Sequence, residues 1–241
     1  MSETLHRATV PVPRTAAQNG HGRLRPATVR TQVTVPLRFS DGYATSGRVF
    51  SFDGLVDDAE HVAIGLGEWQ AALDRSAAGG PAPVVRPHSE CLTGDVFGSQ
   101  RCDCGPQLRE AVEHIAGTGG FLLYLRQEGR GIGLYAKLDA YALQDSGLDT
   151  YEANLALGRG EDERDYTAAA QMLLALGANR VALLSNNPDK AAQLDRLGVR
   201  VTQRIPTGVH VSEANVRYLA TKVSRAAHTL HLPPAAGAVG G

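Results

Sequence analysis

The cysteines are the residues in this sequence whose type and spacing most clearly indicate chemistry. The chain has 3 cysteines, and they fall in one short segment, at Cys91, Cys102 and Cys104. An odd number of cysteines cannot pair completely within one chain, so a disulfide framework is not expected. Three thiolates suit Zn²⁺, and three protein ligands leave one coordination position open, as in catalytic zinc sites. Two other interpretations stay open: buried thiols without a metal, and a closed structural site completed by His88 or Glu90.

Two segments that combine arginine with chemistry-bearing neighbours lie near the cysteines in the sequence. Residues 86–90 read Arg-Pro-His-Ser-Glu directly before Cys91, and residues 126–133 read Arg-Gln-Glu-Gly-Arg-Gly-Ile-Gly after an apolar run. Guanidinium groups beyond the carboxyl end of a strand can bind a phosphate through paired hydrogen bonds. A solvated turn would have a similar composition. The second segment is neither a P-loop nor a Rossmann fingerprint, because the required lysine and glycine spacings are missing.

Two further polar segments are candidates for phosphate binding or proton transfer. Residues 185–190, Ser-Asn-Asn-Pro-Asp-Lys, follow an apolar run and open a helical pattern, so helix N–H groups and Lys190 could hold a phosphate. An ordinary helix cap explains the same residues without a ligand. The charged run 160–165 places Asp162 two positions before Arg164. That pair is compatible with a base and a phosphate contact, although a solvated loop is the simpler interpretation.

The elements that must position these segments follow from periodicity and turn signals. Residues 31–80 contain short β-prone runs separated by Asp-Gly turns, which predict a small N-terminal β-rich portion. Beyond it, helices alternate with strands, which indicates an α/β fold of three layers, α/β/α, around a largely parallel, mixed sheet. Tyr141 has helical spacing from Leu134 and Leu138, which fits a core tyrosine. Helices are predicted from Pro106 and over 134–145, 166–176 and 188–197, and strands over 121–125, 181–184 and 199–205.

Composition and charge bound the domains and the partners. The sequence divides into a disordered basic tail, the β-rich portion, a catalytic domain and a flexible tail, at residues 1–30, 31–80, 81–230 and 231–241. The basic tail faintly resembles an organellar transit peptide, which is kept as an alternative. The net charge of −1 gives no reason to expect nucleic acid or an anionic membrane as partner. No apolar run is long enough for a membrane span, and no secretory signal is present, so we expect a cytoplasmic protein.

Taken together and in order, these motifs resemble the GTP cyclohydrolase II family. The resemblance runs from about Val84 to Lys222, whereas residues 31–80 resemble the family only loosely. The segments that carry it are His-Ser-Glu-Cys-Leu-Thr-Gly-Asp at 88–95, Arg-Cys-Asp-Cys-Gly at 101–105, Arg-Gln-Glu-Gly-Arg at 126–130, Ala-Tyr-Ala-Leu-Gln-Asp at 140–145, Asp-Glu-Arg-Asp at 162–165 and Asn-Asn-Pro at 186–188.

The resemblance implies a complete reaction. The three cysteines would bind one catalytic Zn²⁺ per subunit, whose water attacks C8 of the guanine ring of GTP, and Mg²⁺ would accompany the triphosphate. Formate and pyrophosphate would leave, giving 2,5-diamino-6-(5-phosphoribosylamino)pyrimidin-4(3H)-one in the first step of riboflavin biosynthesis. The resemblance also implies a homodimer. The implied GTP-binding residues are Arg86, Pro87, His88, Ser89, Glu90, Gln107, Glu128, Gly129, Arg130, Thr150, Ser185 and Lys190.

Three residues carry implied catalytic roles. Asp162 would accept a proton, and Arg164 would be the nucleophile that takes the α-phosphate. Because guanidinium is a poor nucleophile, physical chemistry favours Arg164 as an electrostatic clamp instead. Tyr141 accompanies full turnover in the family. Two alternatives stay open: a variant that releases the formamidopyrimidine intermediate for a specialised metabolite pathway, and a non-catalytic module that binds zinc or a nucleotide.

Overall fold

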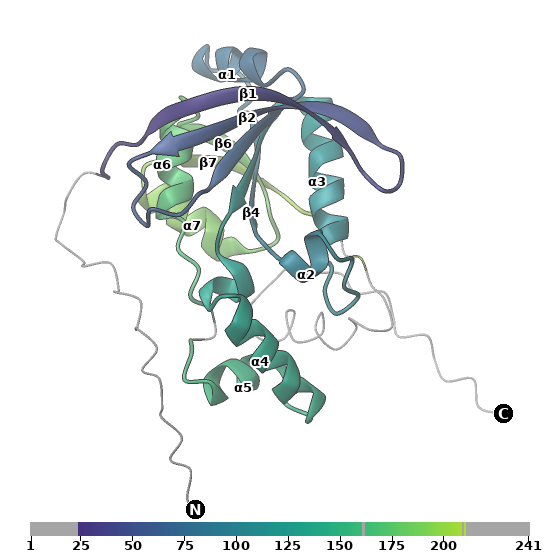
Figure 1. Cartoon of the computed structure of the whole chain (residues 1–241). Helices are drawn as coiled ribbons and strands as arrows, with labels where there is room; N and C mark the ends of the chain where they lie inside the picture. The colour runs from purple at the N-terminus through teal and green to yellow at the C-terminus, as the bar shows by residue number, and fades with distance from the viewer. Residues whose placement is uncertain (1–23, 161, 209, 211–241) are drawn as a thin grey trace, which may run out of the picture.

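One seven-stranded mixed sheet organises the protein (Figure 1). The structure is a computed structural model that describes residues 24–160, 162–208 and 210. The strand order is β1-β2-β3-β5-β4-β6-β7; the pairings among β1, β2, β3 and β5 are antiparallel, and those among β5, β4, β6 and β7 are parallel. The strands span Thr28–Arg38 (β1), Ala44–Asp53 (β2), Val62–Leu66 (β3), Val84–Ser89 (β4), Gly120–Leu125 (β5), Arg180–Leu184 (β6) and Arg200–Ile205 (β7).

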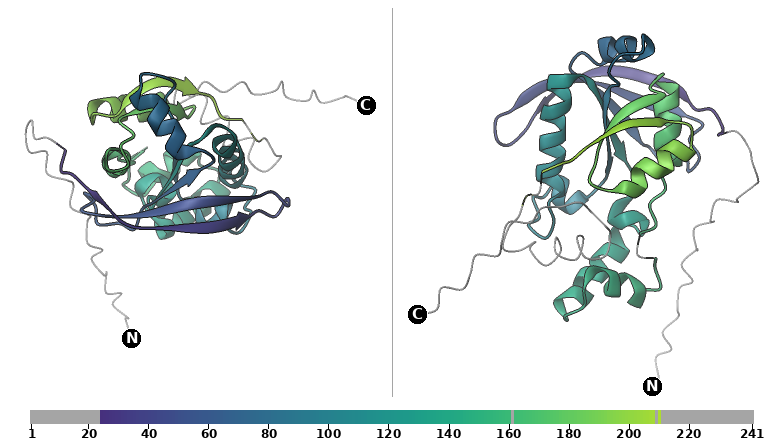
Figure 2. Two further views of the ribbon diagram at one scale, coloured as in Figure 1. Left: turned by 90° about the horizontal axis from the view of Figure 1, so that it is seen from above. Right: turned by 180° about the vertical axis from the view of Figure 1, so that it is seen from behind.

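Helices cover both faces of the sheet, which confirms the predicted α/β fold. Seen from behind, α3 stands on one side of the strands and the pair α6 and α7 on the other (Figure 2). The helices of the described residues span Trp69–Ala77 (α1), Leu92–Asp95 (α2), Cys104–Thr118 (α3), Leu134–Asp145 (α4), Thr150–Ala156 (α5), Thr167–Ala175 (α6) and Pro188–Arg196 (α7), and a 3-10 turn η1 spans Glu128–Gly131.

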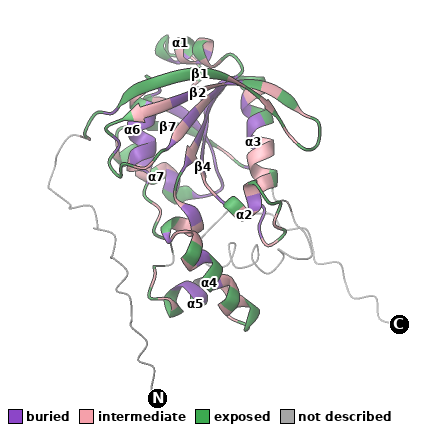
Figure 3. Ribbon diagram, in the orientation of Figure 1, coloured by how far each residue is buried: buried purple, intermediate pink, exposed green. Residues whose placement is uncertain are grey.

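The apolar run in β5 explains why the sheet is covered on both faces. Phe121 and Leu123 belong to a core that includes Met172 of α6, whereas Leu122 belongs to a second core with Ile115 of α3. Successive side chains of a strand point to opposite faces, so a continuous apolar run is what a two-sided core requires. The central strands are buried, whereas β1 at the edge is largely exposed (Figure 3).

The parallel strands bring the candidate segments to one edge of the sheet. β4, β5 and β6 run in the same direction, so the residues after Ser89, Leu125 and Leu184 emerge together. This is the edge at which α/β proteins bind ligands. Helices α4 and α5 lie beyond it, at the bottom of the view in Figure 1.

The boundaries differ from the sequence predictions in several places. β1 begins at Thr28, so residues 28–30, predicted as tail, are strand, because they extend the pairing with β2. Helix α3 begins at Cys104, ahead of Pro106, and α1, β4, α2 and α5 were not predicted. The tail segments 1–23 and 231–241 lie outside the described residues. Within the described part of the chain, no helix is long and apolar enough to cross a membrane.

Candidate active site

A pocket at the carboxyl ends of β4, β5 and β6 collects most of the predicted site residues. Pro87 does not line it, but its carbonyl accepts a hydrogen bond from Lys190 Nζ (2.9 Å) and so helps to place that ammonium. The side chain of Thr150 lies outside the described part of the chain. The predicted residues that line the pocket are Arg86, His88, Ser89, Glu90, Cys91, Cys102, Cys104, Gln107, Glu128, Gly129, Arg130, Tyr141, Asp162, Arg164, Ser185 and Lys190.

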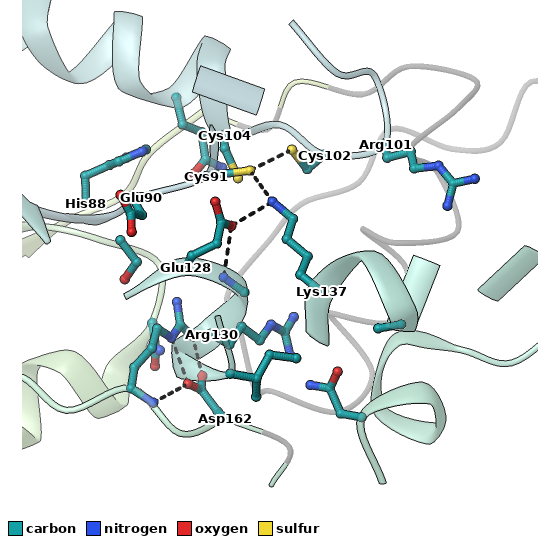
Figure 4. Close-up of a pocket in the computed structure, with 18 of the residues that line it drawn as sticks. His88, Glu90, Cys91, Arg101, Cys102, Cys104, Glu128, Arg130, Lys137 and Asp162 are labelled. Atoms are coloured by element: carbon teal, nitrogen blue, oxygen red, sulfur yellow. Dashed lines mark hydrogen bonds and ion pairs between the residues drawn. The ribbon is translucent and has the colours of Figure 1, made fainter. Parts of the chain in front are cut away.

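The three cysteines converge at one end of this pocket (Figure 4). Their Sγ atoms all lie within 4.8 Å of one another, and Cys91 Sγ is 3.6 Å from Cys102 Sγ. Gly94 in α2 makes this approach possible, because a Cβ there would lie 2.7 Å from Cys102 Sγ and 3.1 Å from Cys91 Sγ. The three sulfur atoms can therefore lie this close together because residue 94 has no side chain.

The chemistry of the thiols fits a divalent cation. Hydrogen bonds from Cys102 and Cys104, together with the ammonium of Lys137, lower the pKa of the Cys91 thiol far below its usual value. Hydrogen bonds to Cys102 and Cys91, with burial, raise the pKa of Cys104. Three adjacent thiols cannot all ionise without a compensating positive charge, and a bound Zn²⁺ would supply it. The residues present therefore fit the predicted metal.

Neither residue named as a possible fourth ligand belongs to the metal-ligating cluster among the described residues. His88 Nε2 lies 3.0 Å from Asp95 Oδ2, which also accepts hydrogen bonds from Cys91 N (3.0 Å) and from Tyr124 OH (2.9 Å). Glu90 forms an ion pair with Arg126, with Nε 2.7 Å from Oε2. These contacts fix the chain around Cys91 and favour an open three-thiolate site over a closed structural one.

A second part of the pocket lining, the cationic wall, carries positively charged side chains. Arg86 is buried; its Nη1 donates to Leu184 O (3.1 Å) and its Nη2 to Gln107 Oε1 (2.9 Å). Arg86 Nε is also buried and has no hydrogen-bond partner among the described residues. Arg130, Arg164 and Lys190 complete this wall. A buried donor without a partner is costly, so a ligand oxygen or a water is expected there.

Asp162 and Arg164 form a pair beside this wall. Arg164 Nε donates to Asp162 Oδ1 (2.7 Å), and a second hydrogen bond joins Arg164 Nη2 to Asp162 Oδ2. Burial opposes ionisation of the carboxyl group, but the hydrogen bonds and charge of Arg164 outweigh it and hold the pKa of Asp162 below its ordinary value. The pair is therefore ionised at neutral pH.

The loop that carries Asp162 contacts the glycine-rich loop after β5, which includes residues 128–131. Glu163 N donates to Arg130 O (3.0 Å), and a Cβ on Gly131 would lie 2.9 Å from Glu163 O. Gly129 and Arg130 both have φ near +62°, a conformation that costs a residue such as arginine energy. The sequence segment that carries Glu128 is thus held in a sharply bent form by the neighbouring loop.

Several residues of the pocket were not predicted from the sequence. Lys137 and Arg101 reach it from α4 and from the loop before Cys102. Asn186 Nδ2 donates to Thr207 O (3.0 Å), and Thr207 N donates to Asn186 Oδ1 (3.1 Å), so the chain after β7 closes one side. Lys137 has the spacing of an ordinary helix residue, so no local pattern marked it as a site residue. The pairing with Thr207 joins residues distant in sequence and left no local pattern.

The fold and the pocket define an α/β protein in which three clustered thiols, a possible metal site, share one pocket with several cationic side chains. A sequence model of the family described as GTP cyclohydrolase II matches residues 30–206. The chain is 50% identical over 184 residues to GTP cyclohydrolase-2 of Vibrio cholerae serotype O1, covering 76% of this chain and 89% of that protein. It is 47% identical over 205 residues to GTP cyclohydrolase-2 of Psychromonas ingrahamii, covering 85% and 98%. This chain belongs to the GTP cyclohydrolase II family.

A longer relative also matches. The riboflavin biosynthesis protein RibBA of Bacillus subtilis is 48% identical over 201 residues, which cover 83% of this chain and 47% of that protein. The matched part of RibBA is thus about half of its length.

Proposed function

We propose that this protein is a GTP cyclohydrolase II, which hydrolyses the guanine imidazole ring of GTP and releases formate and pyrophosphate. The observation that carries the proposal is the convergence of three thiols, within 4.8 Å of one another, in a pocket whose other wall is cationic. A metal site and a phosphate site in one pocket suit a substrate whose ring is hydrolysed and whose triphosphate is cleaved. The product would be the diaminopyrimidinone ribosyl phosphate that begins riboflavin biosynthesis.

The metal site would be formed by Cys91, Cys102 and Cys104. Zn²⁺ held there would supply Lewis-acid activation of water for attack at C8 of the guanine ring. Gly94 keeps room for the ion, and Asp95 orients Cys91 through its backbone N–H. Mg²⁺ bound to the triphosphate is proposed as well, because the departing pyrophosphate carries charge that must be neutralised.

The remaining residues would bind, orient and exchange protons. Arg86, Arg130 and Lys190 would bind the triphosphate, with Arg86 Nε donating a hydrogen bond to a phosphate oxygen. The Glu128 carboxylate, buried at the pocket wall, would accept hydrogen bonds from N–H groups of the guanine. His88, Ser89, Glu90, Gln107, Gly129, Thr150 and Ser185 are proposed as further GTP contacts.

Asp162 and Arg164 would act at the α-phosphate. The ionised Asp162 carboxylate can accept a proton, and its two hydrogen bonds orient the Arg164 guanidinium. We propose that Arg164 stabilises charge on the α-phosphate as a clamp, because its pairing with a carboxylate keeps the guanidinium protonated and weakly nucleophilic. Mass spectrometry of the enzyme during turnover tests this role: the clamp predicts no guanylylated protein, and such an adduct contradicts it.

Tyr141 would support the complete reaction. Its hydroxyl lies 3.5 Å from Thr93 Oγ1, and the Arg101 guanidinium lies 4.8 Å from its ring centroid. These contacts hold the phenol on the thiol side of the pocket, where the ring-opened intermediate would lose formate. A Tyr141→Phe variant should therefore retain more of the formamidopyrimidine than the parent does.

Product identification from GTP tests the proposed function. Zinc-loaded protein is incubated with Mg²⁺ and GTP, and formate and pyrophosphate are quantified. The mass of the nucleotide product is determined by mass spectrometry. The proposal predicts equal amounts of formate and pyrophosphate. Pyrophosphate without formate would identify the variant that releases the formamidopyrimidine, and unchanged GTP would identify a non-catalytic module.

Assembly and location are part of the proposal. We propose a homodimer from the family resemblance, and the exposed apolar side chains of Phe97 (72%) and Tyr135 (82%) offer surface that an interface would bury. Sedimentation at several concentrations tests the dimer. Free thiols support a reducing compartment such as the cytoplasm.

A further inference from the structure

Lys137 has a place in the pocket that the proposed function does not yet use. It extends from α4 between the thiol cluster and Glu128, and its side chain is buried (Figure 4). Its Nζ lies 3.0 Å from Cys91 Sγ, 3.0 Å from Thr93 Oγ1 and 2.8 Å from Glu128 Oε1. An ammonium has three N–H donors, and three acceptors converge on this one.

The Glu128 end of this contact is rigid. Its Oε1 also accepts from Gly129 N (2.9 Å), and its Oε2 accepts from Leu92 N (2.7 Å). Both oxygens are therefore oriented, one toward α4 and the other toward the first residue of α2. The Glu128 carboxylate has further lone pairs that would accept hydrogen bonds from a purine, and their direction depends on the ion pair with Lys137.

At Cys91, the Lys137 ammonium would compensate the negative charge of the thiolates. Three thiolates and one divalent cation carry a net negative charge in a buried place, and an adjacent ammonium compensates it. A hydrogen bond to a ligating sulfur also fixes the direction in which that sulfur points. Two connections join Cys91 to Glu128. One runs through the backbone, because Leu92, which follows Cys91, donates its N–H to Glu128; the other is Lys137, which contacts both side chains.

We propose that Lys137 is a positioning residue that couples the metal-binding end of the pocket to its purine-binding end, by holding Cys91 and Glu128 in one fixed arrangement. Because the three donors of the ammonium are matched by these acceptors, the residue acts through them and does not contact the substrate. The inference rests on the proposed function for the identity of the purine ligand, but its metal half stands without it.

The test uses Lys137→Met, which keeps the length of the side chain and removes the charge and donors. Asp139→Asn is the matched control, because it changes one charge at an exposed position of the same helix. Zinc affinity is measured by competition with a chelator in the absence of GTP. We expect a loss of about tenfold or more in Lys137→Met, as for other groups that orient metal ligands, and none in the control.

A second readout is GTP affinity of the zinc-free protein, measured for Lys137→Met, Glu128→Gln and the double variant. If Lys137 acts through Glu128, each single variant weakens GTP binding by about tenfold and the double variant is little worse than either. Zinc affinity of Lys137→Met within twofold of the parent, or additive losses in GTP affinity, would overturn the proposal.

Lys137→Arg is a second variant for the case in which Lys137→Met does not fold. It keeps the charge, but a planar guanidinium cannot direct three donors from one nitrogen, so intermediate losses are expected in both readouts. Unchanged values in a folded Lys137→Arg protein would overturn the proposal as well. A parent protein that leaves GTP intact would refute the proposed function and leave the zinc measurement to decide the role of Lys137.

Discussion

The two walls of the pocket differ in how completely their polar groups are satisfied. On the thiol wall, Cys91, Lys137 and Glu128 form a continuous set of hydrogen bonds within the protein. On the cationic wall, Arg86 Nε is buried without a partner among the described residues. The comparison indicates that contacts within the protein hold the thiol wall together, whereas the cationic wall keeps one buried donor, Arg86 Nε, for a ligand oxygen or a water. Variants on the two walls should therefore fail in different ways.

The largest expected effect comes from removing a ligand on the thiol wall. Cys102→Ser replaces a soft sulfur by a hydroxyl that is a poor zinc ligand at neutral pH, so formate release should fall by at least about 1,000-fold. Formate is measured enzymatically and zinc by atomic absorption on the same sample. Val96→Ala, at a 65% exposed position of the loop before the cysteine, is the control. Formate release near the parent rate in Cys102→Ser would remove the metal from the mechanism.

On the cationic wall, Arg164→Lys should impair catalysis without loss of metal. The charge stays, but the paired hydrogen bonds to Asp162 and the planar fork are lost, so pyrophosphate release should fall by about 100-fold or more. Zinc affinity should match the parent. Arg196→Lys in α7, at an exposed position, controls for the substitution itself. Loss of zinc together with activity would show that the two walls are not separable.

Gly94→Ala tests whether the thiol wall is as closely built as the geometry indicates. The added methyl group would lie within 2.7 Å of Cys102 Sγ, so the sulfur atoms must move apart, and zinc affinity should fall by about 10- to 100-fold. Gly117→Ala in α3 is a matched control, because nothing lies within 4 Å of a Cβ there. Equal zinc affinity in both alanine variants would mean that the cluster tolerates expansion.

The smallest effect concerns the support of the glycine-rich loop. His61 accepts a hydrogen bond from Arg126 N (2.8 Å) and pairs with Asp57 (2.9 Å). Burial raises the pKa of Asp57, but the hydrogen bond and charge of His61 outweigh it and lower the pKa overall. The stabilisation is therefore present above the unfolded pKa of about 3.9 and is lost as the pH falls through the lower folded value.

Asp57→Asn should remove this stabilisation. Because the carboxylate is 48% exposed, the cost at pH 7 should be at most about 1 kcal/mol, and the difference from the parent should shrink below about pH 4. Urea unfolding at several pH values measures it, with the exposed Glu60→Gln as control. A difference that grows as the pH falls would contradict the assigned sign.

The sequence predicted the cysteines and all four residues of the cationic wall, but it missed Lys137 and the strand that carries Arg86. Three clustered cysteines have few uses in a reduced protein, and α4 has the predicted bounds because its pattern is uninterrupted. β4 was missed because a buried strand that reads Val-Val-Arg-Pro-His-Ser has the polar residues of a loop. Its Arg86 is tolerated in the core only because Leu184 and Gln107, distant in sequence, accept its hydrogen bonds.

Other features depended on tertiary contacts that no local pattern encodes. Lys137 has the spacing of an ordinary helix residue, and its importance arises from the two loops that converge on it. The extension of β1 to Thr28 depends on pairing with the far end of β2. The division of the chain into an N-terminal β-rich portion and a catalytic domain stays a prediction, although β3 pairs directly with β5.

Titration of zinc into metal-free protein, with formate release from GTP measured at each step, tests the central claim most directly. If the three sulfur atoms hold the catalytic ion, formate release rises in proportion to added zinc and levels off at one zinc per chain. Full formate release before any zinc is added, or a plateau unrelated to zinc bound at the cysteines, would contradict the account.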